Sequence, residues 1–160
     1  MIRARQPGDL PELVRVLRKV HLADGYPGGW PADPLAFVEH ADPLGAWVAE
    51  TDGQVVGQVL LCSLQPGNAW NAAPGCDLVE IKRLFVSPSA WGLGLAQQLM
   101  QAALAESARR RGQAVLETRA DNEAANRFYQ RGGWRLAGTA RATWTDADGR
   151  HPRMQRYTAP

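Results

Sequence analysis

Apolar positions along this chain follow two different periods, and each period predicts a different kind of element. Apolar residues recur every three to four positions in 10–20, which predicts a helix. Apolar runs at 46–50, 54–63 and 78–86 predict strands, and Asp52-Gly53 between the first two is a strong hairpin signal. Further strands are expected at 2–5, 114–118, 134–143 and 153–158, and further helices at 35–40, about 93–111 and 122–131.

This order of elements predicts an α/β (α+β) fold in a single domain over residues 1–160. The strand–helix–strand unit from 78 to 118 should place its strands in parallel, whereas the hairpins are antiparallel. We therefore expect a mixed, mostly antiparallel, twisted sheet of about seven strands with helices on both faces. Segments 24–34 and 65–75 are predicted loops, and Gly112 is expected to cap the helix before it.

Composition indicates a globular protein and argues against a nucleic-acid-binding or membrane protein. Hydrophobic residues make up 45% and charged residues 21%, as in an ordinary globular domain. A net charge of +2 is too small to indicate a nucleic-acid partner, and no apolar run approaches the ~20 residues of a membrane span. The charged first twenty residues do not fit a signal peptide, so we expect a cytoplasmic protein. Cys62 and Cys76 could pair, but reduced thiols are the default there.

The most informative segment joins the strand at 78–86 to the helix that follows. It reads Trp91-Gly-Leu-Gly-Leu-Ala96, so two glycines form a tight turn at a helix N-terminus. Free amides and the helix dipole favour an anion there, and glycines let it approach closely. The dinucleotide fingerprint is incomplete because Gln97 stands where its third glycine belongs, and the P-loop Gly-Lys-Ser/Thr is absent. Taken alone, Gly-x-Gly fits a purely structural turn equally well.

A second motif lies downstream. The residues that carry it are Asn122, Ala125, Phe128, Tyr129, Gly133 and Trp134. With these two motifs in this order, the chain resembles the GNAT superfamily of N-acyltransferases over nearly its whole length. The family's signatures are Gln/Arg-x-x-Gly-x-Gly/Ala and Asn-x-x-Ala-x-x-Phe-Tyr-x-x-x-Gly-Phe. This chain departs from them at Trp91, in place of Gln or Arg, and at Trp134, in place of Phe.

The resemblance implies a central parallel strand pair that forms an acyl-CoA cleft, with acetyl-CoA as the acyl donor. The backbone of Leu84, Phe85 and Val86 is expected to pair with the pantetheine arm as an added strand would. Further cofactor contacts are expected from Trp91, Gly92, Leu93, Gly94, Leu95, Ala96 and Gln97 at the pyrophosphate, and from Asn122, Ala125 and Tyr129. Trp91 supplies no charge; its N–H could donate to a phosphate, or its ring could lie against the cofactor. No metal is expected, because the three histidines are scattered.

Acyl transfer to an amine needs a base for the ammonium and benefits from an acid for the departing thiolate. Glu80 is the candidate base, because burial in its strand would raise its pKa, and the family often uses an acidic residue on this strand. Its alternative role is an ion pair with Lys82 or Arg83. Tyr129 is the candidate acid; alternatively, its hydroxyl fixes the cofactor sulfur or a backbone group.

Candidate acceptor residues lie on the same strand and on the first loop. By simple alternation Lys82 shares a face with Glu80 while Arg83 points away, unless a bulge intervenes. Lys82 either binds a substrate carboxylate or pairs with Glu80. Tyr26 and Trp30 either line a small-molecule pocket or anchor their loop.

The resemblance and these residues together predict an acetyltransferase that acts on a small-molecule primary amine by direct attack in a ternary complex. The alternatives are a protein N-terminal or lysine acetyltransferase and a non-catalytic acyl-CoA-binding module. Neither a nucleic acid nor a membrane is an expected partner. Exposed strand edges would allow a homodimer, a state that is common in the family.

Overall fold

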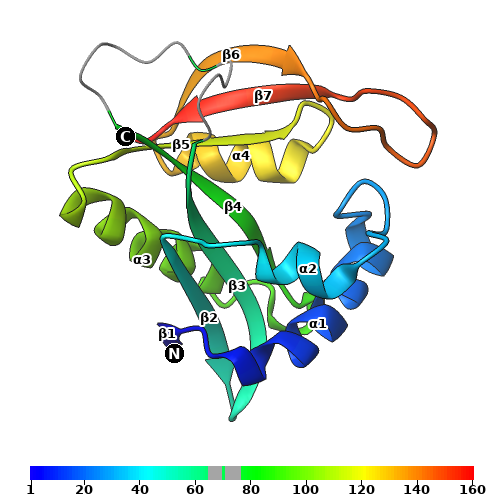
Figure 1. Ribbon diagram of the computed structural model, residues 1–160, viewed down its shortest axis with the longest axis vertical. Coiled ribbons are helices and arrows are strands. Elements are labelled where there is room, and N and C mark those ends of the chain that lie inside the picture. Colours follow the sequence, from blue (N-terminus) through cyan, green and yellow to red (C-terminus); the bar gives the residue numbers. More distant parts are fainter. Residues whose placement is uncertain (65–69, 71–76) are drawn as a thin grey trace.

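The computed structural model describes residues 1–64, 70 and 77–160, and its described part is built around one seven-stranded sheet (Figure 1). The strands are β1 (Ile2–Ala4), β2 (Gly45–Thr51), β3 (Gln54–Ser63), β4 (Leu78–Val86), β5 (Gln113–Arg119), β6 (Arg135–Arg141) and β7 (Arg153–Thr158). The helices are α1 (Leu10–Asp24), α2 (Pro34–Glu39), α3 (Leu95–Arg109) and α4 (Glu123–Arg131), with 3-10 turns η1 (Pro7–Asp9) and η2 (Pro88–Ala90). In space the strand order is β1-β2-β3-β4-β5-β7-β6.

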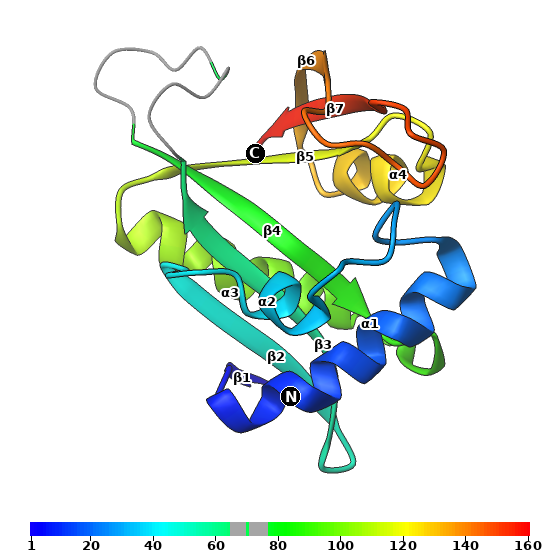
Figure 2. The same cartoon turned by 45° about the vertical axis from the view of Figure 1, so that its right-hand side comes forward.

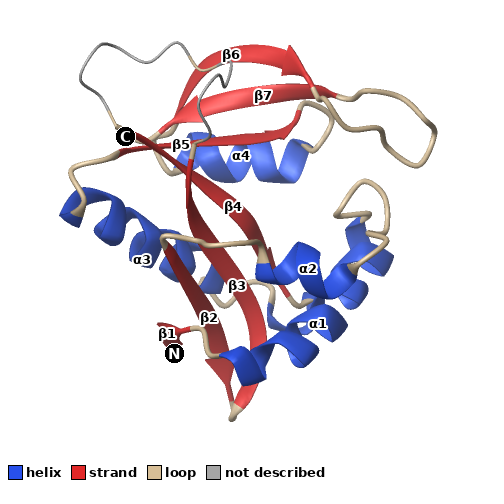
Figure 3. Cartoon of the chain, viewed as in Figure 1, coloured by secondary structure: helices blue, strands red, loops and turns tan. Residues whose placement is uncertain are grey.

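Helices cover both faces of the sheet, as the sequence predicts (Figure 3). Leu95, Leu99 and Ala103 of α3 are buried in one hydrophobic cluster, which Tyr129 of α4 also contacts. Leu13 and Leu17 of α1 belong to a second cluster, to which α2 and β4 contribute as well. Each helix buries one apolar stripe against the sheet, and this burial is the main source of its stability.

The parallel pair β4–β5 is short. The two strands pair only at Leu78–Gln113, Val79–Ala114 and Glu80–Val115, and all other neighbouring strands are antiparallel. Beyond Glu80 the strands diverge, so that β5, β7 and β6 turn away from the rest of the sheet (Figure 2). The predicted mixed, mostly antiparallel sheet with a central parallel pair is confirmed.

A bulge in β4 changes which residues face the acceptor side. Leu60 of β3 pairs with Lys82, but Gln58, two residues earlier, pairs with Phe85, three residues later on β4. The extra residue falls at Arg83, whose φ of 55° is left-handed. Simple alternation therefore does not hold here, as expected for a strand with a bulge, and Arg83 lies on the side of α2, where its Nε donates to Phe37 O.

Most element boundaries match the prediction, and the exceptions have local causes. Strands β3, β4 and β7 have the predicted bounds. α3 begins two residues later than expected, because Gly92 and Gly94 both adopt positive φ and cannot continue a helix. At its other end the left-handed residue is Arg111 rather than Gly112. Gly112 instead permits close packing, because a Cβ there would lie 3.2 Å from the Val79 methyls.

Candidate active site

The backbone of β4 after Glu80 offers a free edge at the centre of the sheet. On one side Phe85 and Val86 pair with Gln58 and Gly57 of β3, but on the other side β5 has already diverged. Backbone groups of Leu84, Phe85 and Val86 can therefore receive an extended ligand as an added strand. This is the position that the sequence predicts for the pantetheine arm.

The glycine turn after β4 leaves a set of amides without partners at the start of α3. Gly92 has φ 81° and Gly94 has φ 74°, conformations that cost other residues free energy. A Cβ at either glycine would meet nothing within 4 Å, so the turn faces open space. Gly94 precedes the helix and brings no capping side chain, which leaves the amides of Leu95, Ala96 and Gln97 for water or an anion. These amides are suited to an anion, and their expected contact with a pyrophosphate stays a prediction.

Trp91 takes up a role that the sequence did not predict. Its indole Nε1 donates to Val86 O at 2.7 Å, so the side chain folds back onto the end of β4. Trp91 remains 51% exposed and Leu93 59% exposed, and both flank the turn. The indole N–H is used inside the protein, which leaves the exposed ring, rather than the N–H, to contact a cofactor.

Glu80 lies on β4 in surroundings that favour its neutral form. Its side chain is 15% exposed, and Lys82 Nζ lies 3.7 Å from its Oε2. Burial raises the pKa of Glu80; Lys82 opposes this shift and Glu117 adds to it. Lys82, as predicted, shares the face of Glu80, and their ion pair is long. Glu80 therefore combines a raised pKa with an ion pair to Lys82, and its role as a base stays a prediction.

Glu117 of β5 is a second carboxylate near Glu80 that sequence reasoning did not single out. Val115 pairs with Glu80, so Glu117, two residues further along β5, lies on the same face of the sheet. Arg156 of β7 donates to Glu117 at 2.7 Å and lies over the Trp70 ring, 5.3 Å from its centroid. In the sequence, alternation along β5 indicates which face Glu117 lies on. It does not indicate which residue of β4 lies opposite, so it does not place Glu117 near Glu80.

Tyr129 lies near the C-terminal end of α4, in contact with the cluster that contains α3. Its ring centroid is 5.7 Å from that of Tyr157 and 6.1 Å from that of Trp134. Burial raises the pKa of Tyr129, and the nearby Tyr26 and Tyr157 raise it further. The phenol is therefore protonated at neutral pH and can donate a proton.

The loop between α1 and α2 holds Tyr26 and Trp30 in different settings. Tyr26 packs against Phe85 and Phe37, with ring centroids 6.3 and 6.4 Å apart. Trp30 packs on α1, where His21 lies 5.4 Å from its ring centroid and Arg18 Cζ 5.6 Å. Tyr26 thus borders the end of β4, whereas the contacts of Trp30 are those of a loop anchor.

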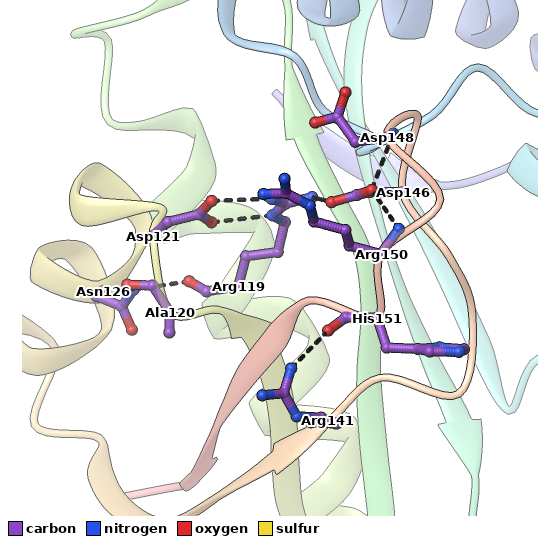
Figure 4. Close-up of polar contacts among 9 residues, drawn as sticks. All are labelled: Arg119, Ala120, Asp121, Asn126, Arg141, Asp146, Asp148, Arg150 and His151. Carbon is purple, nitrogen blue, oxygen red and sulfur yellow. Dashed lines mark hydrogen bonds and ion pairs between the residues drawn. The ribbon is translucent and has the colours of Figure 1, made fainter.

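Arg119, the last residue of β5, ties two loops together (Figure 4). Its guanidinium makes two hydrogen bonds to Asp121, of 2.9 and 2.8 Å, and lies 3.7 Å from Asp146 Oδ2 in the β6–β7 loop. Asp146 in turn accepts hydrogen bonds from the backbone of Asp148 and Arg150. A Cβ on Gly28 of the α1–α2 loop would lie 2.8 Å from Arg119 Nη1, which shows how closely the loop packs here.

Asn122 and Ala125 are hydrogen-bonded to each other at the start of α4. Asn122 caps α4, because its Oδ1 accepts from Ala125 N at 3.1 Å. Asn126 then fastens the helix start to β5 by donating to Arg119 O at 3.0 Å. The Asn-x-x-Ala pattern therefore has a local structural role, and a role in cofactor binding stays a prediction.

The described residues contain neither a metal-binding cluster nor a membrane-spanning helix. Within residues 1–64, 70 and 77–160, no three His, Cys, Asp or Glu side chains are grouped to hold a metal ion. No helix in the same ranges has both the length and the apolar character of a membrane span. Cys62 is buried in β3, and Cys76 lies outside the described residues, so their pairing stays untested.

Comparison with solved structures supports the fold. The ribosomal-protein-S18-alanine N-acetyltransferase of Escherichia coli aligns with a TM-score of 0.74 at 18% identity, over 100% of this chain and 92% of that one. The structure of Arabidopsis thaliana NAA60 in complex with acetyl-CoA aligns with a TM-score of 0.74 at 19% identity, over 99% and 96%. At such identities the likeness is one of fold alone.

Comparison of sequences identifies the family. A mycothiol acetyltransferase from Mycobacterium sp. (strain JLS) is 31% identical over 150 residues, which are 89% of this chain and 47% of that relative. The chain thus spans about half the length of the curated relative. Residues 18–134 match the model of the Acetyltransferase (GNAT) family. Because that match covers well over half of the chain, this protein belongs to the GNAT family of acetyltransferases.

Proposed function

We propose that this domain transfers the acetyl group of acetyl-CoA to the nitrogen of a small primary amine. The observation that carries the proposal is Glu80, a partly buried carboxyl with a raised pKa at the point where β4 and β5 part. A glycine turn suited to a diphosphate follows the same strand. One structural neighbour was solved with acetyl-CoA, and a curated relative is a mycothiol acetyltransferase, which supports a small-molecule acceptor.

In this proposal Glu80 accepts a proton from the acceptor and Tyr129 donates one to the leaving group. Glu80, directly or through water, takes a proton from the acceptor ammonium, which frees the nitrogen lone pair to attack the thioester carbonyl. As the new N–C bond forms and the C–S bond breaks, Tyr129 gives its proton to the departing thiolate. The nitrogen then gives its second proton, directly or through water, to the Tyr129 phenolate, which restores the phenol and leaves a neutral amide. Backbone amides near Phe85, on the free edge of β4, stabilise the carbonyl oxygen as negative charge develops. Acetyl-CoA supplies the activated acyl group.

The loops over the acceptor side favour a small acceptor. The α1–α2 loop contacts β4 through Tyr26 and the end of β5 through Gly28, so it bridges the two diverging strands. Ala147 N of the β6–β7 loop also donates to Gly28 O at 3.4 Å. Two loops in mutual contact leave less room for an extended chain than an open groove would.

Protein N-terminal acetylation is the second candidate. The fold itself accommodates a protein acceptor, because the ribosomal-protein-S18-alanine N-acetyltransferase of Escherichia coli has the same fold. The two candidates differ in the acceptor and share the cofactor and the candidate proton-transfer groups. A peptide panel run beside a small-amine panel separates them by kcat/KM.

The test of the proposed base is the pH profile of thiol release for Glu80→Gln beside Glu117→Gln. Without the Glu80 carboxylate only amine that is already neutral reacts, so its rate rises with pH towards the amine pKa of about 10. The loss of kcat/KM should be about 100-fold or more near pH 7 and should shrink as the pH rises.

Glu117→Gln controls for the loss of a carboxylate on the same face and should lower activity without this pH dependence. A pH-independent defect in Glu80→Gln would exclude Glu80 as the base. A steep pH-dependent defect in Glu117→Gln alone would assign the base to β5.

A further inference from the structure

The bulge in β4 places two cations side by side next to the candidate base. Lys82 Nζ is 3.7 Å from Glu80 Oε2, near the limit for an ion pair, and the Lys82 side chain is 31% exposed. Arg83 donates from Nε to Phe37 O at 3.1 Å and stacks on the Phe37 ring, with Cζ 3.7 Å from its centroid. Its side chain also hydrogen-bonds the Tyr26 hydroxyl, which leaves part of the five-donor guanidinium for a ligand. Both cations therefore retain donors for a ligand.

Arg5 provides a comparison, because its guanidinium makes several hydrogen bonds within the protein. Arg5 donates to Val38 O, Glu39 O and Gln58 Oε1, at 2.9 to 3.0 Å. This set of acceptors holds Arg5 as a structural group that fastens β1 to the end of α2. Lys82 and Arg83 have no comparable set, although both lie in the middle of a strand.

The positive field of this cluster acts on the groups around it. Burial lowers the pKa of His40, and Lys82 and Arg83 lower it further. Arg83 also counteracts the burial that raises the pKa of Tyr26. His40 and Tyr26 come from the two ends of the segment that contains α2, so the field extends across the acceptor side from Glu80 to Tyr26. An anion placed there would be stabilised by each of these neighbours.

We propose that Lys82 and Arg83 bind a carboxylate of the acceptor, so that the acceptor is an amine with a carboxylate a few bonds from its nitrogen. This inference rests on the proposed function and deepens it. Lys82 lies beside Glu80, so an anion held by the two cations stands next to the group that takes the ammonium proton. A planar guanidinium matches a carboxylate with two parallel hydrogen bonds. Glu80 and Glu117 nearby would repel a doubly charged phosphate more strongly than a carboxylate.

The competing explanation is that Arg83 only fastens α2 to the sheet through Phe37. Both explanations predict some loss of activity when Arg83 is changed. They differ in whether the loss depends on the charge of the acceptor, so the test compares matched acceptors.

The experiment measures kcat/KM for amino acids and for their carboxamides, which lack only the negative charge. The quantity of interest is the acid-to-amide ratio for each variant, because intrinsic differences between the two amines cancel between variants. The wild-type protein should favour the acids, and Arg83→Gln should lower the ratio about 10- to 100-fold. Arg83→Lys should keep part of the preference. Arg135→Gln, which removes an exposed charge on β6, should keep all of it.

The affinity of each amino acid and each carboxamide for the protein loaded with free CoA can be measured without turnover. Calorimetry should show that the wild-type protein binds the acid more tightly than the amide and that Arg83→Gln loses this preference. If Arg83→Gln does not fold, Lys82→Gln is measured in its place. Equal affinity of the wild-type protein for acid and amide, or an equal loss for both in Arg83→Gln, overturns the inference. Acid-selective binding without thiol release would support the inference and refute the proposed catalysis. If no amine binds or reacts, both fall.

Discussion

At the scale of single residues, Glu80 and Tyr129 are the two groups that we propose for proton transfer. Burial raises the pKa of both groups, which makes Glu80 a stronger base than an exposed glutamate and keeps Tyr129 protonated. Glu80 lies on β4, where it pairs with β5, and Tyr129 lies on α4. That the two act at one reaction centre is part of the proposed function.

Tyr129→Phe tests the acid. Removing the hydroxyl should lower kcat at least about 100-fold, while the affinity for acetyl-CoA changes less than about threefold, because the ring contacts remain. Steady-state kinetics and calorimetric titration measure the two effects.

Tyr157→Phe is the matched control for the loss of a phenol. Tyr157 is fully buried and its hydroxyl contacts Asn126 at 2.6 Å and Gln155 at 2.9 Å. Its loss should cost about 1–3 kcal/mol of unfolding free energy with little change in kcat. If Tyr129→Phe weakened acetyl-CoA binding as much as it lowered kcat, Tyr129 would be a binding residue only.

The sequence alone predicts some of these residues and not others. Glu80 and Tyr129 stand out because one is an acid in a buried strand and the other completes a family motif. The face of Arg83 could not be predicted without knowing whether β4 contains a bulge, because strand periodicity does not reveal one extra residue. Glu117 was missed because its nearness to Glu80 depends on the register between two strands that a whole helix separates.

At the scale of elements, the turn between β4 and α3 combines two left-handed glycines with an uncapped helix N-terminus. Its two left-handed glycines end one element and leave the first amides of the next without partners. The sequence predicted this turn, because Gly-x-Gly between a strand and an amphipathic helix is a local signal. It did not predict that Trp91 would bond to Val86, because that contact depends on how the chain folds back.

Gly94→Ala tests whether the turn holds the diphosphate. The substitution should cost about 1–2 kcal/mol of stability, because alanine is strained at a φ of 74°. A methyl group there would project into open space and should weaken acetyl-CoA binding at least about tenfold by blocking close approach.

Gly53→Ala in the β2–β3 hairpin is the control, with the same φ of 74° and equally open surroundings. It should lose similar stability and leave the dissociation constant unchanged. Equal affinities for the two variants would mean that the turn at Gly94 is structural only.

At the scale of the whole molecule, the proposed acyl-CoA site depends on the divergence of β4 and β5. Beyond Glu80 the sheet opens a backbone edge in its centre, which a continuous sheet would hide. The order of elements predicted the parallel pair. It did not predict that only three residue pairs would form before the strands part, because strand length in the sequence says nothing of how far two strands stay together.

Calorimetric titration with acetyl-CoA tests the central claim most directly, with desulfo-CoA and NAD as controls. We expect one molecule of acetyl-CoA to bind per chain. Desulfo-CoA should also bind, because it keeps the diphosphate and the amide groups of the arm. NAD should not bind, because it has no pantetheine to pair with β4. If acetyl-CoA does not bind, or NAD binds equally well, the free edge of β4 and the glycine turn do not form an acyl-CoA site.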